Sequence, residues 1–226
     1  MCGRYTMRTP LTLLIEQFNA RPELVQTTFL PRYNIAPTQS ILAVRAGSDE
    51  ERVISELHWG LIPAWSKEPR GTTINARAET IAEKPMFRSA FRSRRCLILT
   101  DGYYEWARIG SKKQPYLFEI GQRPFAFAGI WESWRGEGQT PLQSCAIITT
   151  SANALASTIH DRMPVILHPT DYDAWLDPGN KDAAELARLL VPWESDDLTM
   201  RPVSTFVNNA RNEGPQCVEP TSIEQG

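Results

Sequence analysis

The pattern of apolar and polar residues predicts a chain built mainly of short strands. Runs rich in β-branched and aromatic residues are separated by clusters of glycine, proline and charged residues, such as residues 110–113 and 136–138. We predict strands over residues 41–45, 53–59, 96–100, 103–107, 116–120, 125–131, 145–149, 165–167 and 198–202. Residues 32–38 should be extended, because the residue before Pro37 avoids the helical region.

Helical periodicity is confined to short segments. A first helix should begin with Thr9 as its N-cap and Pro10 at its first position, followed by apolar residues on one face (Leu11, Leu14, Ile15 and Phe18). Further short helices are predicted at about 85–93, 152–159, 170–177 and 180–190. Strands and helices do not alternate regularly, which favours an α+β fold, rich in antiparallel strands, with a sheet curled toward a barrel.

Length and composition fit one globular domain over residues 1–226. Hydrophobic residues make up 42% and charged residues 22% of the chain, which excludes a disordered chain, a collagen and a coiled coil. No window approaches the ~20 apolar residues of a membrane span, and the start lacks the apolar region of a secretory signal. We therefore expect a cytoplasmic protein with no membrane association.

The net charge of −2 is unevenly distributed. Residues 66–95 carry eight basic and three acidic side chains, whereas residues 171–226 carry four basic and eleven acidic ones. A local basic patch on a slightly acidic protein suits a site that holds a few phosphates rather than a long duplex, although a solvated surface would have the same composition.

The four cysteines are far apart, and only three histidines are present. Without a Cys-x-x-Cys pair, we expect no metal site and no cofactor. Cys96 and Cys145 lie in apolar runs and are interpreted as small buried hydrophobic residues, while Cys217 lies in a polar tail and is interpreted as incidental.

Cys2 has a chemistry of its own. Removal of Met1 would leave an α-amine and a thiol on neighbouring carbons, with ordinary pKa values of about 7.7–8.0 and about 8.5, so that both groups would be partly nucleophilic near neutral pH. An aldehyde can form an imine with the amine, and the thiol can then close a five-membered thiazolidine ring. Alternatively, the thiol can attack amides with its own amine as base.

Three further motifs combine polar groups suited to catalysis. Residues 75–80 bring together Asn75, Arg77 and Glu79. Glu105 lies between aromatic residues, where a carboxyl would have a raised pKa and would be able to shuttle protons. His160 lies beside an aspartate and an arginine. Purely local roles also fit these residues, namely a turn for Asn75, a surface position for Glu105 and a helix-end cap for His160.

At these positions the sequence resembles the SRAP (SOS-response-associated peptidase) family. The family includes shields of abasic sites that crosslink DNA to an N-terminal cysteine. Seven motifs, in family order and within residues 2–210, carry the resemblance: Met-Cys-Gly-Arg-Tyr at 1–5, Arg-Tyr-Asn-Ile-Ala-Pro at 32–37, Trp-Gly-Leu-Ile-Pro-Ala-Trp at 59–65, Ile-Asn-Ala-Arg-Ala-Glu-Thr at 74–80, Asp-Gly-Tyr-Tyr-Glu-Trp at 101–106, Thr-Thr-Ser-Ala at 149–152 and Ile-His-Asp-Arg-Met-Pro at 159–164. The fold that it implies is a single α+β domain with a bifurcated sheet forming a pseudo-barrel and short flanking helices. The extent of the resemblance implies a core at about residues 2–210 and a C-terminal tail at 211–226.

The resemblance also implies roles for individual residues. Cys2 would be the crosslinking residue, Asn75 would hold it and the opened sugar, Glu105 would move protons, and His160 would assist opening of the sugar ring. The expected DNA contacts are Arg4, Arg77 and Thr149 by resemblance, together with Arg88 from the basic segment and Trp65 as a stacking platform, which Phe87 and Phe91 could share. Some relatives have a second tryptophan where this chain has Ser66, so we expect strand separation at the lesion to depend on another group.

Together, the residues and the resemblance predict a monomeric, nucleoid-associated DNA-damage protein that binds single-stranded DNA and caps its abasic sites with a thiazolidine at Cys2. Two alternatives remain open. One is a peptidase or autopeptidase that uses the N-terminal thiol. The other is a non-catalytic reader of modified bases. An abasic-site lyase activity through the same imine would be a side reaction.

Overall fold

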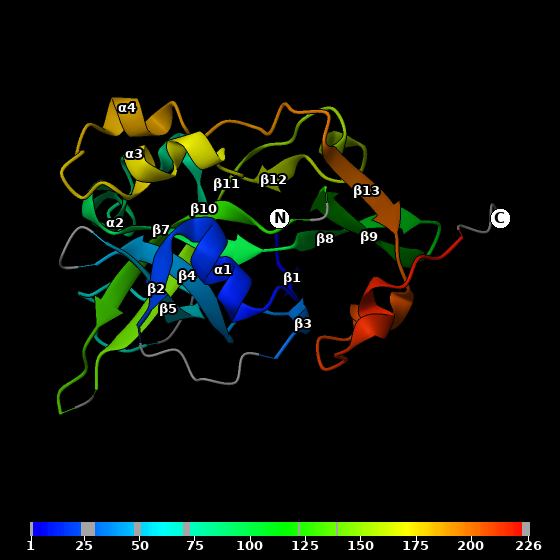
Figure 1. The fold of residues 1–226 in the computed structure, drawn as a ribbon, viewed down its shortest axis with the longest axis horizontal. Helices are drawn as coiled ribbons and strands as arrows, with labels where there is room; N and C mark the ends of the chain where they lie inside the picture. Colours follow the sequence, from blue (N-terminus) through cyan, green and yellow to red (C-terminus); the bar gives the residue numbers. More distant parts are fainter. Residues whose placement is uncertain are drawn as a thin grey trace.

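The computed structural model describes residues 2–23, 30–47, 51–69, 73–121, 123–138 and 140–222. Two sheets make up most of this structure, as Figure 1 shows. No helix among the described residues is long and apolar enough to cross a membrane.

The larger sheet closes into a five-stranded barrel. Its strands are β4 (Ser40–Ala46), β5 (Arg52–Trp59), β7 (Arg95–Thr100), β10 (Phe125–Trp134) and β11 (Leu142–Ser151). They follow one another in the order β11–β10–β7–β4–β5, all antiparallel, and a parallel pairing of β5 with β11 closes the ring. Three short strands extend it, namely β2 (Ala20–Pro22) beside β5, and β6 (Asn75–Arg77) and β12 (Arg162–Pro164) beside β11.

The smaller sheet has the order β13-β9-β8-β1-β3 and branches from the barrel where β7 continues into β8. Its strands are β1 (Tyr5–Met7), β3 (Arg32–Ile35), β8 (Gly102–Ile109), β9 (Lys112–Ile120) and β13 (Leu198–Pro202). At the branch, Thr100 Oγ1 and the Asp101 amide both donate to the carbonyl of Thr6. The predicted α+β fold with a bifurcated sheet is confirmed.

The core fills the barrel and the space between the two sheets. All six residues of β7 are buried, because this strand is covered on both faces. Gly129 of β10 is needed for close packing, since a Cβ atom there would lie 2.8 Å from Ile98 Cδ1 and 2.9 Å from Cys96 Sγ. Tyr5 of β1 packs edge-on against Trp59 and Phe127, which joins the N-terminal strand to the barrel interior.

The helices are short, and α2, α3 and α4 gather on one side of the molecule (Figure 1). The α-helices are α1 (Leu11–Phe18), α2 (Arg88–Ser93), α3 (Tyr172–Leu176) and α4 (Ala183–Ala187). The 3-10 helices are η1 (Ala78–Thr80), η2 (Ala156–Thr158), η3 (Pro169–Asp171), η4 (Thr205–Asn208) and η5 (Pro215–Val218).

Several local predictions were wrong. Pro10, not Thr9, caps α1, because the Thr9 hydroxyl donates instead to Asp101 Oδ1 at 2.6 Å. The strand predicted at 165–167 lies three residues earlier, at β12, where it pairs with the end of β11. Residues 152–159 contain only the single turn η2.

The C-terminal tail is not a detached polar segment. Cys217 of η5 is fully buried in a small apolar cluster with four other buried residues, Tyr104, Leu117, Val203 and Val207. Cys96 and Cys145 are fully buried in the main core, as predicted.

Candidate active site

The four residues predicted to be catalytic come from separate parts of the chain and meet at the N-terminus. Cys2 precedes β1, Asn75 begins β6, Glu105 lies within β8, and His160 lies between η2 and β12. The Asn75 amide donates to the Cys2 carbonyl at 3.0 Å. Electrostatic interactions couple Glu105 both to the Cys2 thiol and to His160. A single site therefore contains a thiol, an amide, a carboxyl and an imidazole.

The position of Cys2 is set by the strand that follows it. In β1, Tyr5 pairs with Ile35 of β3 on one side and with Tyr103 of β8 on the other. The Tyr104 amide also donates to the Arg4 carbonyl at 3.0 Å. Since β8 also carries Glu105, this pairing fixes the spacing between Cys2 and the carboxyl group.

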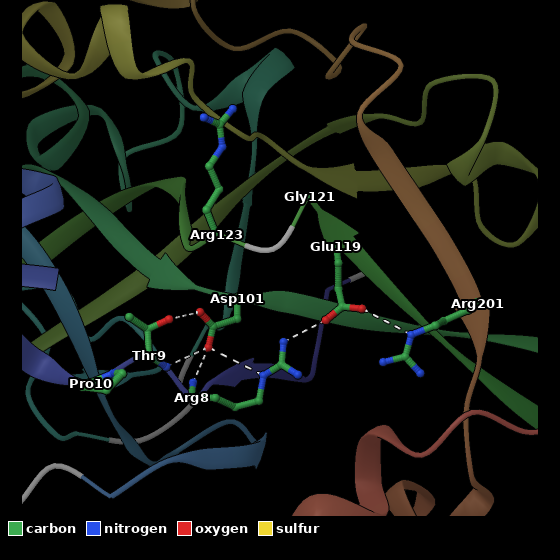
Figure 2. Close-up of a pocket in the computed structure, with 8 residues that line it drawn as sticks. All are labelled: Arg8, Thr9, Pro10, Asp101, Glu119, Gly121, Arg123 and Arg201. Atoms are coloured by element: carbon green, nitrogen blue, oxygen red, sulfur yellow. Dashed lines mark hydrogen bonds and ion pairs between the residues drawn. The ribbon is translucent and has the colours of Figure 1, made fainter. Parts of the chain in front are cut away.

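The other end of β1 is anchored by Asp101, as Figure 2 shows. The carboxylate accepts hydrogen bonds from the amides of Arg8 and Thr9 and from the Thr9 hydroxyl. Arg8 also pairs with Glu119 at 2.7 Å, and Glu119 in turn pairs with Arg201 of β13 at 3.3 Å. These groups line a cleft of ≈ 590 Å³, in which the Arg123 side chain points away from the other two arginines (Figure 2). Because its charges are largely paired with one another, we interpret this cleft as structural support for β1.

Burial changes the chemistry expected of Cys2. The residue is 0% exposed, and this burial, with a further contribution from the charge of Glu105, raises the pKa of its thiol far above the ordinary value. The partly ionised thiol expected from the sequence refers to the chain after removal of Met1 and stays a prediction. The thiol is held protonated near neutral pH, so it needs a base to become nucleophilic.

Glu105 is placed to exchange such a proton. Its side chain is buried, and burial raises the pKa of the carboxyl, as its position between aromatic residues predicted. The nearby His160 lowers that pKa in part, while Asp161 raises it. A carboxyl with a raised pKa can both accept and donate a proton closer to neutral pH than an exposed glutamate can.

His160 has its Nδ1 atom engaged by its own segment. The Arg162 amide donates to Nδ1 at 2.9 Å, and Asp161 Oδ1 lies at the same distance from that nitrogen. In the neutral ring, Nδ1 accepts the amide hydrogen bond and the proton resides on Nε2, whereas the protonated ring can donate from Nδ1 to Asp161.

The surroundings of Cys2 contain buried polar atoms that find no hydrogen-bond partner among the described residues. They include Asn75 Oδ1 and the hydroxyls of Tyr5 and Tyr103. Burial raises the pKa of both phenols, and the charge of Cys2 adds to this effect. Buried polar groups in native proteins are normally paired, so these atoms are available as hydrogen-bond partners for a polar group that enters the site. The sequence analysis missed both tyrosines, since their apolar rings are what the pattern shows.

The predicted DNA contacts differ in their accessibility. Arg77, Arg88 and Trp65 are exposed, with Trp65 68% accessible. Arg4 is partly buried and donates to Asn34 Oδ1 at 2.7 Å and to the Val207 carbonyl at 3.0 Å. It lines a cavity of ≈ 330 Å³ with Gly3, Trp106, Lys113 and Asn208. Thr149 is fully buried, so only its immediate neighbours can reach its side chain.

Part of the basic segment is structural. Arg95 is 4% exposed and donates to main-chain carbonyls, including Trp175 O at 2.6 Å and Phe91 O at 2.9 Å. Arg94 pairs with Glu132 at 2.6 Å, and Arg70 lies outside the described residues. Phe87 and Phe91 are buried in the core, so the prediction that they are stacking platforms was wrong. The remaining exposed cations of this segment are Lys67, Arg77, Lys84, Arg88 and Arg92.

No group of three or more potential metal-ligating side chains is assembled within the part of the chain that the structure describes.

Comparisons with known proteins show which family this chain resembles. The SRAP family profile, described as SOS response associated peptidase, matches residues 1–210. The abasic site processing protein YoqW of Bacillus subtilis is 43% identical over 223 residues, covering 97% of this chain and 99% of the relative. The abasic site processing protein HMCES of Xenopus tropicalis is 34% identical over 230 residues, covering 87% of this chain and 68% of the relative. A crystal structure of a Bacteroides thetaiotaomicron protein matches with a TM-score of 0.88 at 26% identity, covering 98% and 100% of the two chains.

Proposed function

Because the chain belongs to the SRAP (SOS response associated peptidase) family, we propose that it processes abasic sites in single-stranded DNA by forming a covalent bond through Cys2. The observation that carries this proposal is the meeting of Cys2, Asn75, Glu105 and His160 at one point of the fold. The printed names of the relatives, abasic site processing proteins, support the choice of substrate.

The proposed reaction needs Met1 to be removed, so that Cys2 carries a free α-amine. The amine attacks C1′ of the ring-opened deoxyribose, and the aldehyde oxygen leaves as water, which gives an imine. The Cys2 sulfur then adds to the imine carbon, the thiol proton ends on the nitrogen, and a thiazolidine ring closes. The sum is one aldehyde and one aminothiol combining with loss of one water, with no oxidant or reductant.

The other residues have distinct tasks in this proposal. Glu105 donates a proton to the departing oxygen and recovers one from the nitrogen as the imine forms. It then relays the proton of the buried thiol to the nitrogen as the ring closes, which suits a carboxyl whose pKa burial has raised. Asn75 holds the Cys2 main chain and offers its unpaired Oδ1 to a sugar hydroxyl. His160 donates from Nε2 during opening of the sugar ring.

Single-stranded DNA is the favoured substrate, because its unpaired aldehyde can enter the site without the cost of flipping a nucleotide out of a duplex. The exposed cations of residues 67–92 would contact flanking phosphates, and Trp65 would stack on a base. Binding before the crosslink should therefore weaken with salt, whereas the thiazolidine should survive it.

A denaturing gel tests the proposal directly. The purified protein, with its N-terminus verified by intact mass, is incubated with a single-stranded oligonucleotide containing one abasic site. We expect a slower-migrating band whose peptide mass places the adduct on Cys2, and Cys2→Ala should abolish it. Cys217→Ala is the matched control, because it removes a buried cysteine from the separate apolar cluster.

The same experiment separates the alternatives. No band with the wild-type protein would refute the covalent mechanism. If Cys2→Ala bound the DNA as tightly as the wild type and the wild type formed no adduct, the protein would be a non-catalytic reader. Cys2-dependent turnover of an amide substrate, with no adduct, would favour the peptidase.

A further inference from the structure

A short segment, residues 75–80, reaches both sides of the proposed site. At its start, Asn75 donates to the Cys2 carbonyl at 3.0 Å. Four residues later, Glu79 in η1 forms two hydrogen bonds with Arg162, at 2.5 Å and 3.0 Å. Arg162 begins β12 and lies two residues after His160. The segment therefore links the strand end that carries Cys2 to the loop that carries His160.

The Arg162 side chain is firmly held. It is 12% exposed, and besides the two bonds to Glu79 it donates to the Thr149 carbonyl at 2.7 Å. The hydrogen bond from Arg162 is also the largest cause that lowers the pKa of Glu79, so this carboxylate is ionised at neutral pH. A planar guanidinium bound to a carboxylate through two bonds is fixed in direction as well as in place.

The main chain of the same arginine contacts His160. The Arg162 N–H donates to His160 Nδ1 at 2.9 Å, and a nitrogen that accepts this bond carries no proton. The other ring nitrogen, Nε2, then holds the proton of the neutral imidazole. Without this N–H, Nδ1 would be free to take the proton and turn toward Asp161 Oδ1, which also lies 2.9 Å away.

We propose that Glu79 is a positioning residue: by holding Arg162, it keeps the Arg162 N–H on His160 Nδ1 and so keeps His160 in the tautomer that presents Nε2–H. The role of this tautomer in catalysis rests on the proposed function, but the tautomer itself can be measured separately. Among the described residues, the charged groups that act on His160 include Glu105 from β8 and Asp161 and Arg162 from its own segment.

Substitution Glu79→Gln keeps the shape of the side chain but removes the charge that pairs with Arg162. The matched control is Glu23→Gln, because Glu23 pairs with Arg45 at 2.6 Å and that arginine is also 12% exposed. Glu79→Asp keeps the carboxylate and serves as the conservative variant in case Glu79→Gln does not fold.

Nitrogen-15 NMR of the histidine rings is the direct readout. The chain has three histidines, and loss of one signal set in His160→Gln assigns the ring. We expect the Nε2–H pattern for His160 in the wild type and in Glu23→Gln, and a mixture of tautomers in Glu79→Gln. Glu79→Asp should lie between them. An unchanged His160 pattern in both Glu79 variants would overturn the proposal.

Crosslinking to single-stranded abasic DNA is the second readout. Glu79→Gln should react more slowly, on the order of 10-fold, because a misplaced catalytic group loses a large part of its effect, and Glu79→Asp should recover part of the rate. If the wild type forms no crosslink, the proposed function fails, yet the NMR comparison still decides whether Glu79 positions His160. A rate loss of the same size in Glu23→Gln would also overturn the proposal, since it would indicate a general loss of stability.

Discussion

Replacement of Asp101 by alanine should strongly destabilise the protein, because this carboxylate anchors the N-terminal strand. Its side chain is 8% exposed, and it accepts hydrogen bonds from the Arg8 amide, from the Thr9 amide at 3.1 Å and from the Thr9 hydroxyl at 2.6 Å. The Arg8 guanidinium lies 3.7 Å away (Figure 2).

The magnitude follows from what the substitution leaves behind. Each hydrogen bond to a charged acceptor contributes about 1.5–3 kcal/mol, and these contributions are not additive. Asp101→Ala leaves two partly buried main-chain N–H groups and a hydroxyl without their acceptor, and it removes a negative charge that lies beside Arg8. We expect the free energy of unfolding to fall by about 3–5 kcal/mol, as for a broken buried charge network.

Urea unfolding followed by tryptophan fluorescence measures this loss. Asp182→Ala is the control, because Asp182 also accepts from two main-chain amides, at the exposed start of α4. Loss of such a helix cap costs about 1 kcal/mol. A loss for Asp101→Ala no larger than that for Asp182→Ala would refute the reasoning that burial makes this anchor strong.

Three other predictions concern catalysis, binding and packing. Glu105→Gln should slow crosslinking about 100-fold or more, the usual contribution of an acid–base group; an unchanged rate in a gel time course would exclude this role. Burial raises the pKa of Glu105 in the folded protein above the ordinary carboxyl pKa of about 4.3. As the pH rises through this range, the free energy of unfolding of the wild type should therefore fall relative to that of Glu105→Gln. The same pH dependence of stability in both proteins would contradict this. Trp65→Ala should weaken non-covalent binding of intact single-stranded DNA by about 1–3 kcal/mol in a fluorescence titration, with an unchanged melting temperature because the ring is exposed; equal affinity would exclude stacking. Gly129→Ala should lower the free energy of unfolding by about 1–3 kcal/mol in urea, since its Cβ would lie 2.8 Å from Ile98. A stability equal to that of the wild type would show that neighbouring side chains can move to accommodate the methyl group.

The strand centres and the fold class could be predicted because apolar periodicity follows from burial. The observed β13 matches its predicted bounds, and β10 and β11 are longer than predicted by a few residues at their ends. In contrast, β1 was not predicted, because three residues carry no usable period and this strand exists only through pairing with β3 and β8. Thr9 looked like a helix cap from its neighbours in sequence, but a distant carboxylate, Asp101, competes for its hydroxyl.

The sequence proposed the residues of the candidate site, but it indicated only part of the electrostatics that the structure gives them. Cys2 could be chosen for the thiol and the α-amine that it would carry without Met1, and Glu105 for its position between aromatic residues. Asn75 and His160 could be chosen because charged residues stand close to them in the sequence. The raised pKa of the Cys2 thiol could not be predicted, since it results from complete burial beside Glu105. The sequence also did not indicate which aromatic residues are exposed, since Trp65 is exposed whereas Phe91 is buried.

By itself, the sequence determined which reactive groups the protein has and most of the segments that form strands. Both follow from the chemistry of single residues and from the pattern of apolar residues along the chain. The tertiary structure decided which groups meet. It placed Asn75 on the Cys2 carbonyl and Glu79 on Arg162, across separations of 73 and 83 residues. Such contacts, and the burial that shifts pKa values, depend on how strands pair in space, and no local pattern specifies that pairing.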